Sequence, residues 1–205
     1  IGTFLGKSWW DNTYNQTVPA YSNYSDIWCG FENKYPDLGD GEPIEWKPLY
    51  DAINVSSDYS SDANFIAKLY DTYDMPVFLD YYLFIELMLA TDNQGKNTYL
   101  SVYDQTVSPK LTITPWDLDG VWGRRWEGSS NLTYANQNFE TFINTYEHSQ
   151  NNVYIRMLKL NYNNFKTGLK NRYLQLRGSY FSYNSLYSRF EHYYDLFMKS
   201  GAGNR

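Results

Sequence analysis

Residues 77–90 limit the possible folds of this chain more than any other segment, because they are apolar on nearly every face of a helix. Asp74 suits the N-cap of that helix, and Pro76 falls in its first turn, where a missing N–H costs no hydrogen bond. A helix that is apolar all round has to be enclosed, so we expect it to be the central buried helix. The run is too short to cross roughly 30 Å of hydrocarbon, and we expect no membrane span in this chain.

The length and charge of the chain narrow the class of protein. Its 205 residues are enough for one sizeable core, and we expect residues 1–205 to form a single domain. Hydrophobic residues make up 42% of the chain, which argues against disorder. The formal net charge of -6 leaves no basic surface for a phosphate backbone, so we expect no nucleic-acid partner. Cys29 is the only cysteine, which excludes an internal disulfide and a cysteine-rich metal site.

The pattern along the chain predicts three regions. Residues 1–60 are rich in glycine, proline and aromatic residues, with helix breakers that include Pro48, and should be irregular or β-rich, with little long helix. Residues 61–122 contain a short helix after Ser61, then the buried helix, then a hairpin of strands at 97–103 and 111–114. Residues 150–200 show helical spacing again. We therefore expect an α+β fold.

Two acidic turns flank the predicted hairpin. Asp92 precedes Asn97 by five residues, the spacing of the protein-kinase catalytic loop, in which the Asp accepts the substrate hydroxyl proton and the Asn holds Mg²⁺. The second strand leads into Asp117 and Asp119, and carboxylates suit a hard cation that also binds phosphates. Taken from the residues alone, capping and turn carboxylates remain an open alternative.

Four ordered motifs resemble the CotH family, the atypical kinases related to a spore-coat protein. They are FENKYPD at 31–37, FLDYYLFIEL at 78–87, Asp92 with KNTYL at 96–100, and PWDLD at 115–119. Together these motifs cover residues 29–123, and the C-terminal helices fit the family more loosely.

The resemblance implies an atypical protein-kinase-like fold, mostly the helical C-lobe, with a small β-hairpin that carries the catalytic and metal loops. It implies ATP and Mg²⁺ (or Mn²⁺) as cofactors. Carried over by position, Asp92 is the implied catalytic base, and Asn97 and Asp117 are implied metal ligands, with Asp119 as a further one.

The sequence departs from the kinase pattern in its first part. It contains neither a glycine-rich loop nor a Val-Ala-Ile-Lys strand, so we expect the usual N-lobe elements to be absent or to lie upstream of Ile1. Residues 2–7 are interpreted as the last strand of that lobe. Lys7 and Lys34 are candidates for a lysine that faces the phosphates of ATP, with a solvated surface position as the alternative for each.

The expected compartment and partner follow from composition and resemblance together. A bias toward Asn, Tyr, Ser and Trp suits an exported protein, and the family implies a secreted, periplasmic or cell-surface bacterial protein whose signal segment is not in this chain. The leading interpretation is a kinase that phosphorylates hydroxyls of a secreted or surface protein. The alternative is a non-catalytic adhesion or glycan-binding module on the same scaffold, because fold alone does not fix function.

Overall fold

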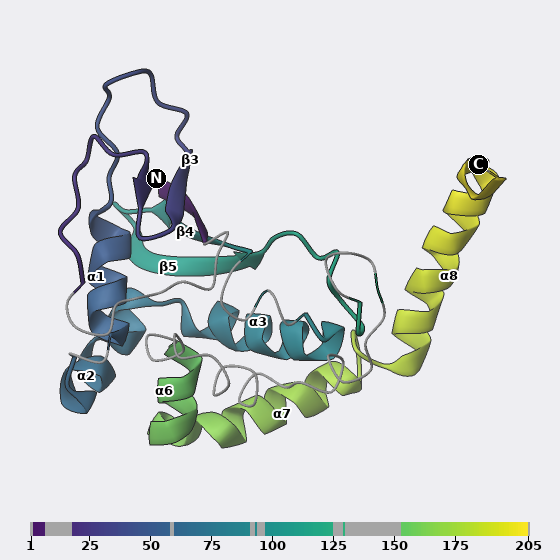
Figure 1. Ribbon diagram of the computed structural model, residues 1–205. Coiled ribbons are helices and arrows are strands. Elements are labelled where there is room, and N and C mark those ends of the chain that lie inside the picture. The colour runs from purple at the N-terminus through teal and green to yellow at the C-terminus, as the bar shows by residue number, and fades with distance from the viewer. Residues whose placement is uncertain are drawn as a thin grey trace. The chain divides into compact units, whose positions relative to one another are not determined.

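The computed structural model describes residues 2–6, 18–57, 60–90, 93, 97–124, 129 and 153–204. The chain divides into two compact units, Ile1–Tyr162 and Asn163–Arg205. Figure 1 shows the described elements of both units. The first unit contains the sheet, and every residue predicted for the site belongs to it by sequence.

The described strands of the first unit form one antiparallel sheet in the order β2-β3-β1-β4-β5. They are β1 (Gly2–Gly6), β2 (Ile27–Trp28), β3 (Phe31–Tyr35), β4 (Thr98–Asp104) and β5 (Ser108–Pro115). Strands β4 and β5 are the predicted hairpin, with Val102 opposite Leu111. The turn between them is tight because the Asp104 carboxylate accepts hydrogen bonds from the N–H and the hydroxyl of Thr106, at 2.9 and 2.7 Å. These bonds also lower the pKa of Asp104.

Strand β1 joins parts of the chain that are far apart in the sequence. It pairs with β3 on one side and β4 on the other, so that Thr3 is aligned with both Tyr35 and Ser101. A strand within residues 2–7 is therefore confirmed. The predicted hairpin supplies two of the described strands of this sheet.

Three helices of the first unit pack against β5: α1 (Lys47–Ser56), α2 (Asp62–Thr72) and α3 (Met75–Met88) (Figure 1). Ser61 begins α2 as predicted, and its hydroxyl accepts a hydrogen bond from the N–H of Asn64 at 3.1 Å. Helix α3 is the predicted central helix, but it is not enclosed on every face, since Val77 is exposed. It ends at Met88 rather than at residue 90, because Leu89 adopts a left-handed φ of 52°.

The core lies where these helices meet the sheet. Its most buried apolar side chains are Trp46, Leu49, Phe65, Leu69, Ile85, Val102 and Leu111. Burying one aliphatic or aromatic side chain contributes about 1.5–3 kcal/mol, so this cluster is a main source of stability. Trp46 also satisfies its indole N–H, which donates to the carbonyl oxygen of Ser25 at 2.9 Å.

Helix α1 contradicts the expectation of little long helix before residue 60. Pro48 was interpreted as a helix breaker, but it stands in the first turn, where its missing N–H would have had no partner. Beyond it, Leu49, Ala52 and Ile53 are buried along one face of the helix. Burial of this face outweighs the local breaker signal.

Arg156 of helix α6 (Val153–Leu160) forms hydrogen bonds to the connection between α1 and α2. Its guanidinium donates to the carbonyl oxygens of Ser57, at 2.8 Å, and Ser60. It also pairs with the Asp62 carboxylate at 2.8 Å and lies 4.7 Å from the centre of the Phe65 ring. One side chain thus satisfies two backbone carbonyls and one carboxylate that are far away in the sequence.

The second unit is helical in its described residues. Its elements are α7 (Phe165–Arg177), α8 (Tyr183–Lys199) and the short turn η4 (Ala202–Asn204), and the turn η3 (Tyr162–Asn164) precedes α7. Ser182 begins α8, and its hydroxyl accepts a hydrogen bond from the N–H of Ser185 at 3.3 Å. Helices within residues 150–200 are thereby confirmed.

The described elements confirm the α+β class and are consistent with a kinase-like fold. Among the described helices, none combines the length and the apolar character that crossing a bilayer requires. The expectation of a single domain over residues 1–205 stays a prediction.

Candidate functional site

The open end of the β4–β5 hairpin brings two predicted site residues to one place. Thr98 lies opposite Pro115 in the ladder, and one further backbone bond extends the pairing: the N–H of Trp116 donates to the carbonyl oxygen of Asn97 at 2.9 Å. Asp117 follows Trp116 directly. The strand register therefore places Asn97 and Asp117 at the same end of the sheet.

Asn97 and Asp117 share an uncommon backbone conformation. Their φ angles are 53° and 55°, in the left-handed region. Asn and Asp enter this region more readily than other residues with a side chain, but it still costs conformational energy. Such conformations persist where the surrounding structure holds them, so the neighbours of both residues matter.

A buried asparagine that the sequence analysis did not single out holds these two turns together. The side-chain Nδ2 of Asn93 donates to the carbonyl oxygen of Asn97 at 2.8 Å and to that of Trp116 at 2.7 Å. Asn93 is only 2% exposed. Its own N–H donates to the carbonyl of Ala90 at 3.1 Å, and its carbonyl accepts a hydrogen bond from the Tyr81 hydroxyl at 2.6 Å.

Helix α3 supports the same region. Tyr81 belongs to this helix, and burial raises the pKa of its phenol well above the ordinary value, so the hydroxyl stays a neutral donor. After the acidic turn the chain returns to the helix, where the N–H of Trp122 donates to the carbonyl of Met88 at 2.9 Å. Helix α3, Asn93 and the hairpin end therefore form one hydrogen-bonded assembly.

The donors at this hairpin end suit a hard cation. Asp117 and Asp119 are exposed carboxylates, and Asn97 contributes an amide oxygen, the donor type that Mg²⁺ prefers. The described residues include no group of three or more His, Cys, Asp or Glu side chains that could hold a metal ion. Mg²⁺ is usually bound through one or two carboxylates together with substrate phosphates and water, so the two aspartates fit such a cation when nucleotide supplies further oxygens.

Two of the predicted site residues, Asp92 and Lys7, lie outside the described residues. Lys34 is described and lies on β3, where its ammonium pairs with the Glu32 carboxylate at 2.5 Å. Strand β1 separates β3 from β4, so the backbone of Lys34 lies roughly 10 Å from that of β4. The sheet thus keeps the backbone of Lys34 apart from the hairpin end, and its role in binding a cofactor stays a prediction.

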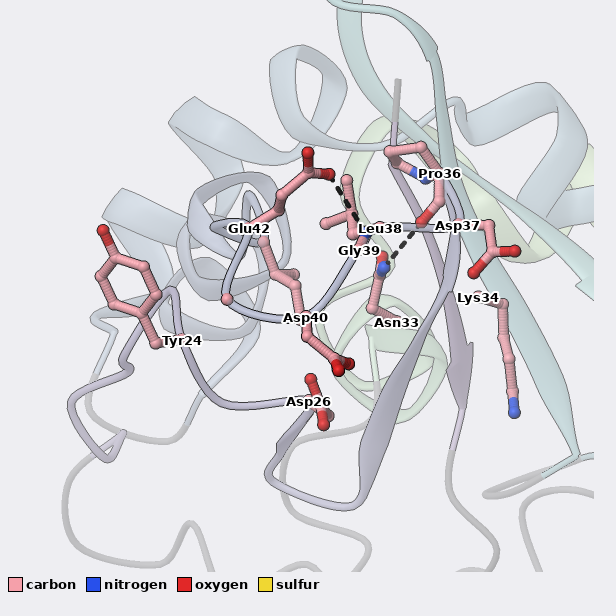
Figure 2. Close-up of a pocket in the computed structure, with 12 residues that line it drawn as sticks. Tyr24, Asp26, Asn33, Lys34, Pro36, Asp37, Leu38, Gly39, Asp40 and Glu42 are labelled. Atoms are coloured by element: carbon pink, nitrogen blue, oxygen red, sulfur yellow. Dashed lines mark hydrogen bonds between the residues drawn. The ribbon is translucent and has the colours of Figure 1, made fainter.

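A separate polar pocket of about 370 Å³ lies beside β3 (Figure 2). Its acidic lining residues are Asp26, Asp37, Asp40 and Glu42. In Figure 2 the carboxylates of Asp26 and Asp40 point toward the same part of the pocket, whereas the side chain of Lys34 extends away from them. Neither Asn97 nor Asp117 lines this pocket, so it is distinct from the predicted site.

The sequence carried little signal for Asn93. A polar residue in a loop between Asp92 and Asn97 is ordinarily interpreted as exposed. Its burial depends on Trp116, whose carbonyl arrives from a position 23 residues further along the chain. Only the strand pairing of the hairpin reveals this contact.

The core is α+β, and helix α3 supports both a polar turn and a Trp-Asp-x-Asp turn at one end of the hairpin. These features are those of a kinase-like domain. The family model described as CotH kinase protein matches residues 12–202, and the chain belongs to this family. Searches among curated proteins and among solved structures gave no significant match.

Proposed function

We propose that this domain transfers the γ-phosphoryl group of ATP to a hydroxyl of a protein, with Mg²⁺ or Mn²⁺ as the divalent cation. The observation that carries the proposal is the hairpin end, where the Asn93 side chain donates to the carbonyls of Asn97 and of Trp116, the residue before Asp117. Asp92 directly precedes Asn93 in the sequence. Membership in the CotH kinase family supports the same class of reaction.

The proposed roles follow from the chemistry of phosphoryl transfer, which relies on positioning and charge rather than on covalent catalysis. Asp92 is the proposed base, whose carboxylate accepts the proton of the substrate hydroxyl. Asn97, Asp117 and Asp119 would hold the cation through their side-chain oxygens. When bound, the cation offsets the charge of the phosphates.

Lys34 and Lys7 are the proposed contacts to the phosphates of ATP. The described ion pair between Lys34 and Glu32 does not exclude this role for Lys34. Its two side chains are 41% and 40% exposed, and an ion pair this exposed contributes at most about 1 kcal/mol. Phosphate oxygens can therefore compete with the Glu32 carboxylate for the ammonium group.

The proposed substrate is a secreted or cell-surface protein, and the domain is proposed to act outside the bacterial cytoplasm. The family membership and the composition, with 22 Tyr and 7 Trp, support this assignment.

Two substitutions test the proposed roles separately. Asp117→Ala should weaken both Mg·ATP binding and turnover, because it removes a cation ligand. Asp92→Ala should leave Mg·ATP affinity nearly unchanged and lower phosphotransfer by roughly 100-fold or more, the scale of a positioned acid–base group. Calorimetric nucleotide titration and radiolabel transfer to a serine-rich protein measure the two quantities.

Asp71→Ala provides the matched control, because Asp71 is an exposed carboxylate on α2. It should change neither quantity. Full activity in Asp92→Ala would remove the assignment of the base.

A glycan-binding module is the competing function, and the half-exposed side chains of Trp116 and Trp122 near the hairpin end favour it as the second candidate. A ligand at 100 times its Kd raises the free energy of unfolding by about 2.7 kcal/mol, so thermal-shift titration separates the two functions. A shift with oligosaccharides and none with ATP and Mg²⁺ would support the module.

A further inference from the structure

We propose that Asn93 is a positioning residue for phosphoryl transfer, which fixes the two turns of the proposed cation ligands Asn97 and Asp117 in one geometry. This inference rests on the proposed kinase function. It assigns a role to a residue outside the predicted catalytic and metal-binding set.

The hydrogen bonds of the Asn93 side chain define its orientation without ambiguity. Both partners, the carbonyl oxygens of Asn97 and Trp116, are acceptors, so the NH₂ group and not the amide oxygen has to face them. Each of the two N–H groups is then used, at 2.8 and 2.7 Å. With 2% of the residue exposed, water has little access to replace either bond.

The backbone of Asn93 is held from the opposite side by helix α3 and its end. The Ala90 carbonyl accepts its N–H, and the Tyr81 hydroxyl donates to its carbonyl at 2.6 Å. Asn93 therefore links helix α3 to the hairpin end. Any shift of its side chain relative to the helix is passed on to both turns.

The two carbonyl groups that Asn93 binds belong to the peptide units next to the proposed ligands. One is the carbonyl of Asn97 itself, and the other is the carbonyl of Trp116, which is bonded to the nitrogen of Asp117. Both proposed ligands have left-handed φ angles, 53° and 55°, which the surroundings have to maintain. Asn93 fixes the peptide unit next to each of them, so its two hydrogen bonds restrict the directions of the Asn97 and Asp117 side chains.

The directions of the Asn97 and Asp117 side chains decide where a cation would lie against the phosphates of ATP. A misplacement of about 1 Å in such a site can cost about 100-fold in rate.

Asn93→Ala and Asn93→Asp test the proposal in the intact protein. Alanine removes both donors, whereas aspartate keeps the shape and, when ionised, directs an oxygen at two carbonyl oxygens. Both variants should lower kcat/KM by about 100-fold and also weaken Mg·ATP binding, since displaced cation ligands affect both quantities, and a higher Mg²⁺ concentration should restore part of the loss. A residue that only supports the fold would lower stability without changing the Mg²⁺ dependence.

Asn54→Ala is the matched control, because the Asn54 Nδ2 also donates to a backbone carbonyl, that of Tyr50, at 3.0 Å within α1. It should retain kcat/KM. If Asn93→Ala does not fold, Tyr81→Phe is the second variant, because it removes one hydrogen bond to the Asn93 backbone. It should lower kcat/KM by about 10-fold, which corresponds to about 1.4 kcal/mol.

Hydrogen exchange gives a readout that does not require activity. The N–H of Trp116 bonds to Asn97 at the hairpin end and should exchange faster in Asn93→Ala, while the N–H of Val102 in the buried part of β4 keeps the wild-type rate. Wild-type kcat/KM in Asn93→Ala, or unchanged exchange at Trp116, would overturn the proposal. If the wild-type protein shows no phosphotransfer, the proposed function is wrong, and so is the catalytic part of this inference. The hydrogen-exchange result would still show whether Asn93 holds the two turns together.

Discussion

Raising the pH above about 10 should destabilise the first unit, because three buried tyrosines cannot ionise in place. Tyr73, Tyr81 and Tyr154 are 5%, 5% and 3% exposed. Each phenol donates a hydrogen bond to a backbone carbonyl, at 2.6 Å for Tyr73 and Tyr81 and at 2.9 Å for Tyr154. Burial raises the pKa of all three phenols well above the ordinary value.

The direction and size of this effect follow from proton linkage. Because the folded-state pKa is raised, the contribution of each phenol is fully present below the unfolded pKa of about 10 and is lost as the pH rises above it. Each ionisation in the unfolded chain lowers the free energy of unfolding by about 1.4 kcal/mol per pH unit. At about pH 11 the three together remove about 4 kcal/mol, a large share of the about 5–15 kcal/mol typical of a domain.

Urea unfolding followed by circular dichroism, from about pH 8 to about pH 11, measures this loss. Tyr73→Phe and Tyr81→Phe should each cost about 1 kcal/mol at the lower pH, because a buried carbonyl loses its donor. Each variant should then lose about 1.4 kcal/mol less than wild type at the higher pH. Tyr103→Phe, at an 85% exposed position, is the control and should leave the curve unchanged. The same pH dependence in wild type and in both buried variants would refute the reasoning.

Two further predictions concern single contacts. Arg156→Lys should lower the free energy of unfolding by about 1–3 kcal/mol in urea titrations, because an ammonium cannot reproduce the planar set of bonds to two carbonyls and a carboxylate; a loss below about 0.5 kcal/mol would contradict the role given to Arg156. Tyr81→Phe should reduce phosphotransfer more than Tyr73→Phe, although each loses a bond of 2.6 Å to a carbonyl, because only Tyr81 binds Asn93. Equal phosphotransfer rates in these two variants, measured at a temperature where both are folded, would show that the bond from Tyr81 to Asn93 does not affect catalysis.

Elements whose signal is local could be predicted from the sequence. The helix over residues 77–90, the capped start of α2 at Ser61 and the hairpin are each encoded within a dozen or so residues, on a scale where periodicity and turn chemistry act. Helix α1 was missed because Pro48 was weighed as a breaker when it stands in the one turn that tolerates proline. Asp74 was placed correctly as the N-cap of α3, although its side chain makes no capping bond there.

Contacts between distant segments could not be predicted in the same way. Nothing in residues 2–6 specifies that this strand lies between β3 and β4, because strand order depends on which long-range pairings bury the most surface. The proposed site combines local and long-range signals in the same way. Spacing and motif predict its acidic turns, whereas the role of the Asn93 amide depends on a carbonyl 23 positions further along the chain.

The geometry of two carbonyl oxygens explains why asparagine occupies position 93. Ionised aspartate offers no donor, serine offers one, and glutamine would place its two donors one methylene further away in a buried site. An amide buried without partners costs roughly 1–3 kcal/mol, so asparagine is tolerated there only because both N–H groups are used. A well-packed apolar residue could stabilise this position as well as asparagine does, yet it would leave the carbonyls of Asn97 and Trp116 without their shared donor. The buried amide therefore contributes a fixed separation between the two turns rather than net stability, and that separation is what positioning for phosphoryl transfer requires.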